Sequence, residues 1–185
     1  MNNQSRLDMH KLSHRVLGFT LTELMVTLVV LSILVGIATP GMRSLLTKQQ
    51  LNSNTHLMVS ILAYARNEAV SRVVKVVICG TSDASTCNGS SDFSEGWLVF
   101  IDNDDDNLFS NGDELLKQGG GEEKSMHFAL DNSDTFISFT DEGESTSVKK
   151  IELCTDDAGS NPNKSRSLTI SMAGSSRISQ GANCP

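Results

Sequence analysis

The chain carries a long apolar segment near its N-terminus, residues 19–38 (FTLTELMVTLVVLSILVGIA). About 20 residues in a helix extend for about 30 Å, which is the thickness of the hydrocarbon core of a bilayer. Glu23 is the one charged side chain in this segment. The sequence therefore predicts a membrane-spanning helix here, and a purely water-soluble fold is not expected.

Charge is distributed unevenly on the two sides of this segment. Residues 1–18 have a net charge of +2, whereas residues 43–185 hold 12 basic and 20 acidic side chains, a net charge of −8. The positive-inside rule places the basic end in the cytoplasm and the acidic body across the membrane. A cleaved secretory signal peptide is the alternative, but its apolar core is usually shorter, and no small-x-small cleavage site follows the segment cleanly.

A second helical pattern follows Pro40 and Gly41, where a proline in a helix predicts a kink or a short unwound stretch. Apolar residues then recur at helical spacing, which predicts an amphipathic helix over about residues 43–72 with one face to bury. The residues of this face are Leu51, Met58, Leu62, Ala65 and Ala69.

The remainder of the chain has the composition of β-strands and polar turns. Loops are expected at 81–94 and 156–165, and the strands are expected to form one antiparallel sheet packed on the helix. The predicted strands are 73–79, 97–101, 126–130, 136–140, 148–154 and 168–171.

The residues around the start of the apolar segment form a motif. Gly18 ends the basic leader, Phe19 follows it, and Glu23 lies five residues after Gly18. With Pro40 further along, this pattern resembles type IV pilins and the pseudopilins of type II secretion. The resemblance implies an α+β pilin fold, a long N-terminal transmembrane helix packed on an antiparallel sheet. It also implies that a prepilin peptidase cleaves between Gly18 and Phe19 and methylates the new amine of Phe19.

The resemblance also gives Glu23 a role. In a filament of packed apolar helices, its carboxylate can neutralise the N-terminal amine of a neighbouring subunit, so that neither charge is buried alone. The alternative is that Glu23 lies near the headgroup boundary and is only tolerated there.

The body of the chain resembles the GspH/FimT-type pseudopilins and minor pilins in three stretches, 65–72 (ARNEAVSR), 96–102 (GWLVFID) and 168–174 (LTISMAG). The resemblance implies a structural subunit of a type IV pilus or type II secretion filament that helps to initiate or cap assembly. Residues 1–18 are then a cleaved leader, 19–42 the transmembrane and assembly half of the helix, and 43–185 a periplasmic domain. The partners would be other pilins, the prepilin peptidase and the bacterial inner membrane.

Four cysteines in an exported body predict two disulfides, and three pairings are possible. Pairing Cys79 with Cys87 and Cys154 with Cys184 is favoured, and long-range pairings stay open. No C-x-x-C pair is present, which disfavours a zinc or redox motif.

Asp102, Asp104 and Asp106 have the 1, 3 and 5 spacing of an EF-hand loop, with Asp113 at position 12. Asn107 replaces the turn glycine, and an aspartate replaces the bidentate glutamate, so an acidic turn between strands is favoured over a calcium site. No metal and no cofactor are expected.

No catalytic motif is found, so an enzyme is not expected. Two alternatives remain, a membrane-anchored domain without a filament and a DNA-binding minor pilin. DNA-binding relatives carry G-R-x-R, where this chain has Gly174-Ser175-Ser176-Arg177. Lys164 and Arg166 could add contacts, but the net charge of −8 opposes DNA binding.

Overall fold

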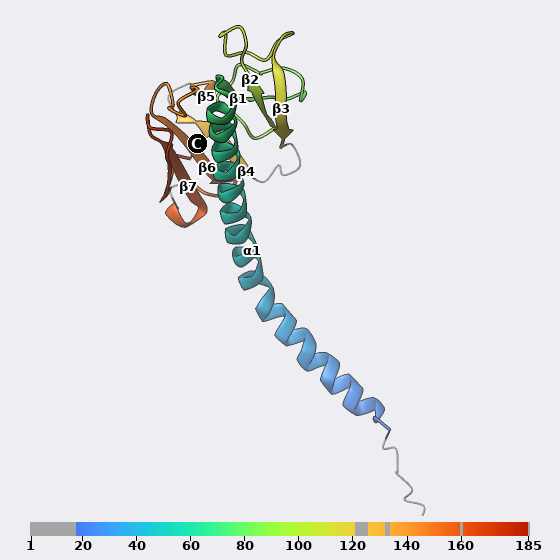
Figure 1. The fold of residues 1–185 in the computed structure, drawn as a ribbon. Coiled ribbons are helices and arrows are strands. Elements are labelled where there is room, and N and C mark those ends of the chain that lie inside the picture. Colours follow the sequence, from blue (N-terminus) through green and yellow to red (C-terminus); the bar gives the residue numbers. More distant parts are fainter. Residues whose placement is uncertain (1–17, 121–125, 132–133, 160, 185) are drawn as a thin grey trace, which may run out of the picture. The chain divides into compact units, whose positions relative to one another are not determined.

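The computed structural model describes residues 18–120, 126–131, 134–159 and 161–184, with the backbone alone described at 38–41 and 43. One helix, α1 (Leu21–Arg72), is followed by two four-stranded sheets (Figure 1). The chain divides into two compact units, residues 1–42 and 43–185. The first part of α1 belongs to the first unit, and the rest of α1 with all the strands belongs to the second.

The first sheet has the strand order β3-β2-β1-β5, and all its neighbouring strands are antiparallel. Its bounds are β1 (Val76–Gly80), β2 (Trp97–Ile101), β3 (Glu114–Gly119) and β5 (Phe136–Phe139). β1 and β2 are apolar and buried along their whole length, as expected for central strands covered on both faces.

The second sheet has the strand order β4-β6-β7-β8 and is also antiparallel throughout. Its bounds are β4 (Met126–Leu130), β6 (Lys149–Thr155), β7 (Ser165–Ile170) and β8 (Ser176–Gln180). A short 3-10 helix, Pro162–Lys164, precedes β7. Every residue of β8 is exposed, so this strand is a solvent-facing edge.

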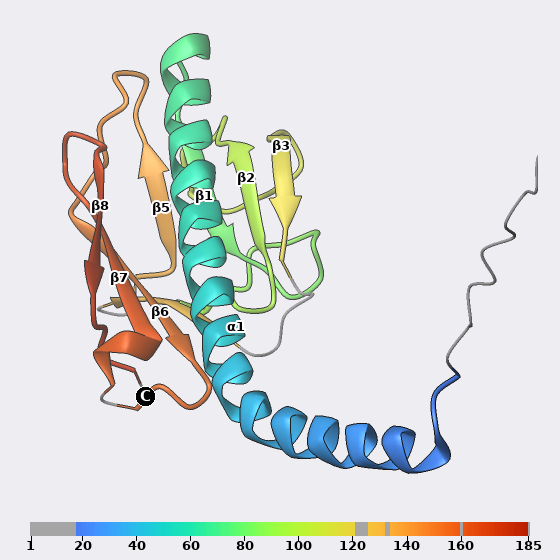
Figure 2. The same cartoon turned by 90° about the horizontal axis from the view of Figure 1, so that it is seen from below.

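The main core lies between the second half of α1 and the two sheets, which flank the helix in Figure 2. The stripe predicted from the sequence is buried, and Ile61 joins it. The first sheet contributes side chains such as Ile78 and Val99, and the second contributes side chains such as Ile151 and Leu168. Burial of these side chains is the main source of the domain's stability.

A smaller core covers the opposite face of the first sheet. Val77, Leu98 and Phe100 are fully buried there, and Cys87 and Phe109 pack against them from the loops. The rings of Phe109 and Phe100 are 5.3 Å apart. The loops after β1 and β2 therefore form a second covering layer, which explains why neither strand alternates between apolar and polar residues.

The structure corrects the predicted β-region in four respects. β7 begins at Ser165, three residues before the strand predicted at 168–171, because the polar residues 165–167 pair with β6. There are two sheets instead of one, and β3 and β8 were not predicted as strands because their exposed residues lack an apolar run. β1 begins at Val76, later than expected, because Val73 takes a left-handed φ of 57°. The amide of Val74 then donates to the carbonyl of Ala69 at 3.1 Å, the bond that closes a Schellman-type helix end.

Candidate functional site

The start of α1 combines a helix cap with an exposed acidic side chain. α1 begins at Leu21, and the amide of Glu23 donates to the hydroxyl of Thr20 at 3.2 Å. Thr20 is therefore the N-cap, and Glu23 stands at the third helical position, as in a capping box. A carboxylate in the first turn is also favoured by the helix dipole. The T-x-x-E spacing of Thr20 and Glu23 is the local sequence signal for this cap.

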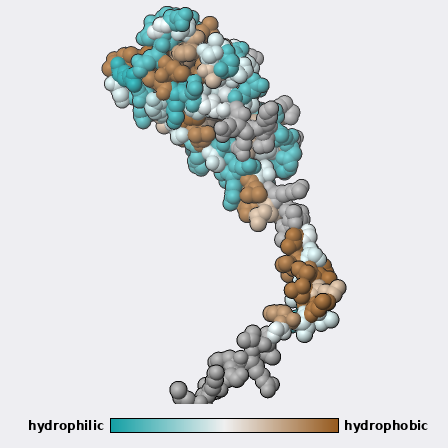
Figure 3. Space-filling view, turned by 90° about the vertical axis from the view of Figure 1, so that its right-hand side faces the viewer, coloured by the Kyte–Doolittle hydropathy of each residue, from teal (hydrophilic) through white to brown (hydrophobic). Residues whose placement is uncertain are grey.

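The first part of α1 is apolar on all its sides. Every side chain from Gly18 to Ile37 is exposed, and large apolar ones such as Leu24 and Ile33 expose 54% and 57% of their surface. Figure 3 shows this segment as a band of hydrophobic surface. The hydroxyls of Thr27 and Ser32 donate to carbonyls of the same helix, at 2.9 and 2.7 Å. The helix thus satisfies these polar groups within itself and presents apolar atoms outward.

A membrane-spanning helix was predicted for residues 19–38. Among the residues that the structure describes, no helix is long and apolar enough to cross a membrane.

Pro40 lies inside α1, which is helical through Pro40 and Gly41. The short unwound stretch that was one expected outcome at this proline is therefore not present. The other expected outcome, a kink at Pro40, stays a prediction.

The end of α1 is fastened to two loops by Arg66. Its guanidinium donates to the carbonyls of Gly143 and Ala173, at 2.9 and 3.1 Å. Gly174 has a φ of 73°, and a Cβ there would lie 2.1 Å from the carbonyl oxygen of Gly143, so a side chain is excluded. Within the ARNEAVSR stretch, Arg66 therefore has a structural role, since it holds two loops against the helix.

The other charged residues of this stretch form an exposed network. Arg72 contacts Glu68 at 2.8 Å and Glu114 of β3 at 2.7 Å. The hydrogen bond from Arg72 to Glu114 raises the pKa of the arginine. This network joins the helix end to the edge of the first sheet.

Two disulfides close segments of the second unit. Cys79 of β1 is bonded to Cys87 in the following loop, and Cys154 of β6 is bonded to Cys184 near the C-terminus. These are the pairings that the sequence favoured. The bonded cysteines are 8 and 30 positions apart, so each bridge closes a loop of the chain and restrains it.

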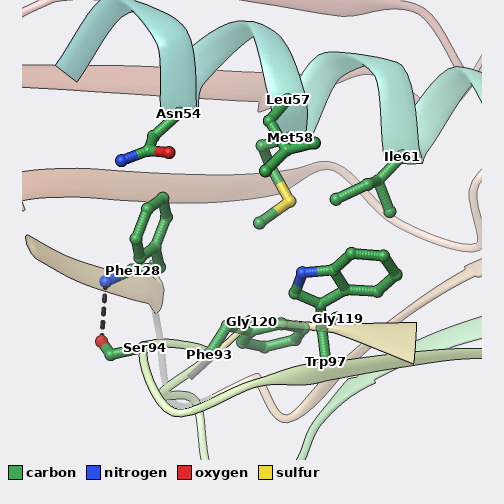
Figure 4. Close-up of a pocket in the computed structure, with 10 residues that line it drawn as sticks. All are labelled: Asn54, Leu57, Met58, Ile61, Phe93, Ser94, Trp97, Gly119, Gly120 and Phe128. Atoms are coloured by element: carbon green, nitrogen blue, oxygen red, sulfur yellow. Dashed lines mark hydrogen bonds between the residues drawn. The ribbon is translucent and has the colours of Figure 1, made fainter. Parts of the chain in front are cut away.

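An apolar cavity of about 590 Å³ lies between α1 and strands of both sheets. Figure 4 shows Met58 and Ile61 of α1 pointing toward Trp97 and Phe128 across it. Gly119 lies against the indole, since a Cβ there would be 2.6 Å from Trp97. The described residues that line the cavity include no ionisable side chain, and the hydroxyl of Ser94 and the amide of Asn54 are among its few polar groups.

Of the acidic residues with EF-hand spacing, Asp102, Asp104 and Asp106 lie together, with carboxylate oxygens within 4.8 Å of one another. Asp113 is not part of this group. Its two oxygens accept the amides of Asn103 and Ser110, at 2.9 and 2.8 Å. Among the described residues, these three aspartates are the group that could hold a metal ion.

The basic residues considered for DNA binding differ in their partners. Lys164 pairs with Asp157, whereas Arg166 bonds to the neutral side chain of Asn52 at 3.2 Å. Arg177 lies on the exposed strand β8, and Gly174 lies in the turn before it.

Comparison with known protein families matches residues 54–175 to the model of type II transport protein GspH. This match covers well over half of the chain. The chain belongs to the GspH family. Residues 13–39 match the prokaryotic N-terminal methylation motif, which includes Gly18, Phe19 and Glu23. No curated protein matched the sequence.

Comparison with solved structures concerns the fold. The type IV minor pilin FimU of Pseudomonas aeruginosa superimposes with a TM-score of 0.57 at 19% identity, over 74% of this chain and 96% of that one. A second crystal form of FimU gives a TM-score of 0.52 at 18% identity, over 75% and 98% of the two chains. The minor pseudopilin EpsH of Vibrio cholerae gives 0.49 at 11% identity, over 70% and 95%.

The predicted α+β pilin fold is therefore confirmed, with the correction that its β-part consists of two sheets. As a GspH-family chain with an N-terminal methylation motif, the protein is a minor pilin or pseudopilin of the type IV pilus or type II secretion class. Members of this family are structural subunits that assemble with other pilin-like chains.

Proposed function

We propose that this GspH-family protein joins a type IV pilus or type II secretion filament through the first part of α1, and helps to initiate or cap its assembly. The observation that carries the proposal is the exposed apolar surface of residues 21–37. A soluble monomer rarely exposes so continuous an apolar surface, so another environment must cover it. Neighbouring pilin-like helices and the lipid of a membrane are both suitable.

The residues before α1 are proposed as the processing site. A prepilin peptidase would cleave between Gly18 and Phe19 and methylate the amine of Phe19. The methylation motif over residues 13–39 supports this proposal. Residues 1–18 would be the leader, 19–42 the membrane and assembly segment, and 43–185 the periplasmic domain.

Before assembly, the subunit would reside in the bacterial inner membrane as a single-pass protein with its N-terminus in the cytoplasm. The charge of +2 on residues 1–18 against −8 on residues 43–185 supports this orientation. We also propose that the protein catalyses no reaction. The apolar cavity has no ionisable lining residue among those described, and the GspH family consists of structural subunits.

The carboxylate of Glu23 is proposed to neutralise the N-terminal amine of a neighbouring subunit. In the structure this side chain is exposed on the first turn of α1, so a neighbour can reach it. An uncompensated charge between apolar helices costs several kcal/mol. This pairing would therefore fix how far one subunit's helix is shifted along the axis of its neighbour's helix.

The test compares two substitutions that both make the segment more apolar. Glu23→Val removes the carboxylate, whereas Thr27→Val one turn further along keeps it. Both variants should reach the membrane, but Glu23→Val should be recovered in sheared filaments at one tenth of the wild-type level or less. Equal recovery of the two variants would contradict the proposed role of Glu23, and absence of the wild-type protein from the filaments would favour a plain membrane-anchored domain.

Mass spectrometry of the mature protein tests the processing step separately. The expected chain begins at N-methylated Phe19, and Gly18→Val should leave the leader attached. A mature chain that begins beyond Ala38 would identify a secretory signal peptide instead and would overturn the pilin-type processing.

Strong DNA binding is not expected. Lys164 and Arg166 already contact groups of the same chain, which leaves Arg177 as the main candidate for a phosphate contact. One such contact gives little affinity at moderate salt. Saturable binding of duplex DNA at low micromolar concentration, lost in Arg177→Gln, would instead support a role in DNA uptake.

A further inference from the structure

The loop between β2 and β3 gathers three carboxylates around one point. Asp102 directly follows the last residue of β2, and oxygens of Asp102, Asp104 and Asp106 lie within 4.8 Å of one another. Asn107 has a φ of 62°, in the left-handed region. An EF-hand loop has glycine at this position, and asparagine tolerates the same conformation well. The absence of glycine is therefore no obstacle to a cation-binding loop.

One oxygen of this group lacks a partner. The side chain of Asp102 is fully buried, and its Oδ2 accepts bonds from the amide of Asn107 and from Lys75 Nζ, both at 3.0 Å. Its Oδ1 is buried and has no hydrogen-bond partner among the described residues. Buried carboxylate oxygens are normally bonded, because losing water without replacement is costly. This oxygen is therefore the one that a missing ligand would contact.

The charge on Asp102 is maintained despite its burial. Its Oδ2 is paired with the ammonium group of Lys75 and accepts the amide of Asn107, and both contacts stabilise the charged form of the carboxylate. Its unpartnered oxygen is thus an acceptor only and needs a proton donor or a cation.

The loop carries more negative charge than the chain neutralises. Five aspartates lie between positions 102 and 113, and Lys75 contacts two of them, Asp102 and Asp105. Because oxygens of Asp102, Asp104 and Asp106 lie within 4.8 Å of one another, their like charges repel, and a cation among these carboxylates would remove that repulsion.

We propose that Asp102, Asp104 and Asp106 bind one Ca²⁺ ion, with Asp102 contributing Oδ1. Three carboxylates alternating along a short loop suit Ca²⁺, which takes six to eight oxygen ligands in flexible geometry, the others here being water or backbone oxygens. Asp113 is not a ligand, because both its oxygens hold backbone amides of the loop. Without a bidentate glutamate, the affinity belongs to the class of extracellular modules, with a Kd of about 10⁻⁴ to 10⁻³ M.

The proposed ion would act on structure. The loop is already attached at Phe109, whose ring packs on Phe100 and whose amide contacts Cys87 Sγ at 3.4 Å. Binding at the start of the loop would fix a second point of it. The covering layer over the outer face of the first sheet would then become more stable.

Full-length protein in detergent micelles, first freed of metal by a chelator, provides the test. Isothermal titration with CaCl₂ should show one saturable site, and the melting temperature should rise by several degrees as Ca²⁺ increases to about ten times Kd. MgCl₂ at the same concentration should give a much smaller rise. No heat and no Ca²⁺-dependent shift would overturn the proposal, and an equal response to Mg²⁺ would overturn the assignment to Ca²⁺.

Two exposed ligands give the decisive variants. In chelator, Asp104→Asn and Asp106→Asn should melt slightly higher than wild type, because each removes a repelled charge. Both variants should bind Ca²⁺ at least tenfold more weakly than wild type. At a Ca²⁺ concentration that saturates the wild type, they should therefore melt lower than it. Asp141→Asn, an exposed aspartate in the turn after β5, is the matched control and should behave as wild type. An unchanged Ca²⁺ response in both ligand variants would refute the site.

Discussion

The two parts of α1 share one helix and differ in what covers them. From Leu21 to Ile37 every side chain is exposed, although most are apolar. From Leu51 to Ala69 one stripe of the helix is buried against two sheets, while the exposed faces are mostly polar. Helix formation alone therefore does not decide burial. The spacing of apolar residues decides it, because a stripe fits a partner on one side and a fully apolar surface needs partners all round.

The two parts of α1 also differ in where the groups that cover them come from. The chain itself supplies the strands that cover the second part of α1. The first part exposes its apolar side chains among the described residues, and lipid or another subunit is the partner that we propose for it. Substitutions in the second part should therefore change the stability of the monomer, and substitutions in the first part should change assembly.

Removing the disulfide between Cys154 and Cys184 should give the largest loss of stability. This bridge closes a 30-residue segment, and the chain-entropy model assigns it about 3.6 kcal/mol. Cys154→Ser with Cys184→Ser should lower the free energy of unfolding by about that amount. Denaturation followed by the fluorescence of Trp97, the one tryptophan in the chain, measures it in the domain itself.

The shorter bridge is the internal control for that measurement. The bond between Cys79 and Cys87 closes 8 residues, and the same model assigns it about 2.5 kcal/mol. Removal of the shorter bridge should therefore cost less. The opposite order would show that enthalpy, and not loop length, controls the contribution of these bridges.

Truncating the buried stripe should have the next largest effect and should separate the two parts of α1 most directly. Ile61 is fully buried, so Ile61→Ala should cost about 3 kcal/mol through lost burial and a new cavity. Ile33 exposes 57% of its surface, so Ile33→Ala should leave the unfolding monitored by Trp97 unchanged. Equal losses in the two variants would contradict the division between the parts.

The second part of α1 was predictable because its periodicity is local information. Leu51, Met58 and Leu62 lie at helical spacing, and the structure buries all three. β2 and β4 were predicted with their observed bounds because each is a compact apolar run between polar turns. The family motif at Gly18 and Phe19 was equally local.

Features that depend on distant residues were not predictable in the same way. The exposed strand β8 is defined by its pairing with β7, and its own residues show no apolar run. The role of Arg66 depends on two carbonyls 77 and 107 positions away. Likewise, the contact between Lys75 and Asp102, and the oxygen of Asp102 that it leaves without a partner, appear only when β1 and β2 pair.

Arg66→Gln should produce a smaller loss than Ile61→Ala. The substitution removes charged hydrogen bonds to the carbonyls of Gly143 and Ala173, and such bonds contribute about 2 kcal/mol. Lys48→Gln, an exposed residue on the same helix, should change the free energy of unfolding by less than about 0.5 kcal/mol. If the two variants are equally stable, the arginine does not fasten the loops in solution.

The smallest effect is expected at the start of α1, where Thr20 caps the helix. Thr20→Ala should destabilise the first turn by about 1 kcal/mol, because the amide of Glu23 loses its acceptor. Hydrogen exchange at that amide in micelles should become about fivefold faster, the fold-change that corresponds to this energy. Thr20→Ser keeps the acceptor oxygen and should exchange as wild type. Unfolding monitored by Trp97 should stay unchanged in both variants.

The same pair of variants distinguishes two roles of Glu23. Thr20→Ala weakens the cap but leaves the carboxylate of Glu23 in place. If that carboxylate acts on the amine of a neighbouring subunit, the variant should still enter filaments, and Glu23→Val should not. If Glu23 matters instead because it helps to start the helix, both variants should fail together. Recovery of Thr20→Ala in sheared filaments therefore decides whether the acidic residue serves its own helix or the next one.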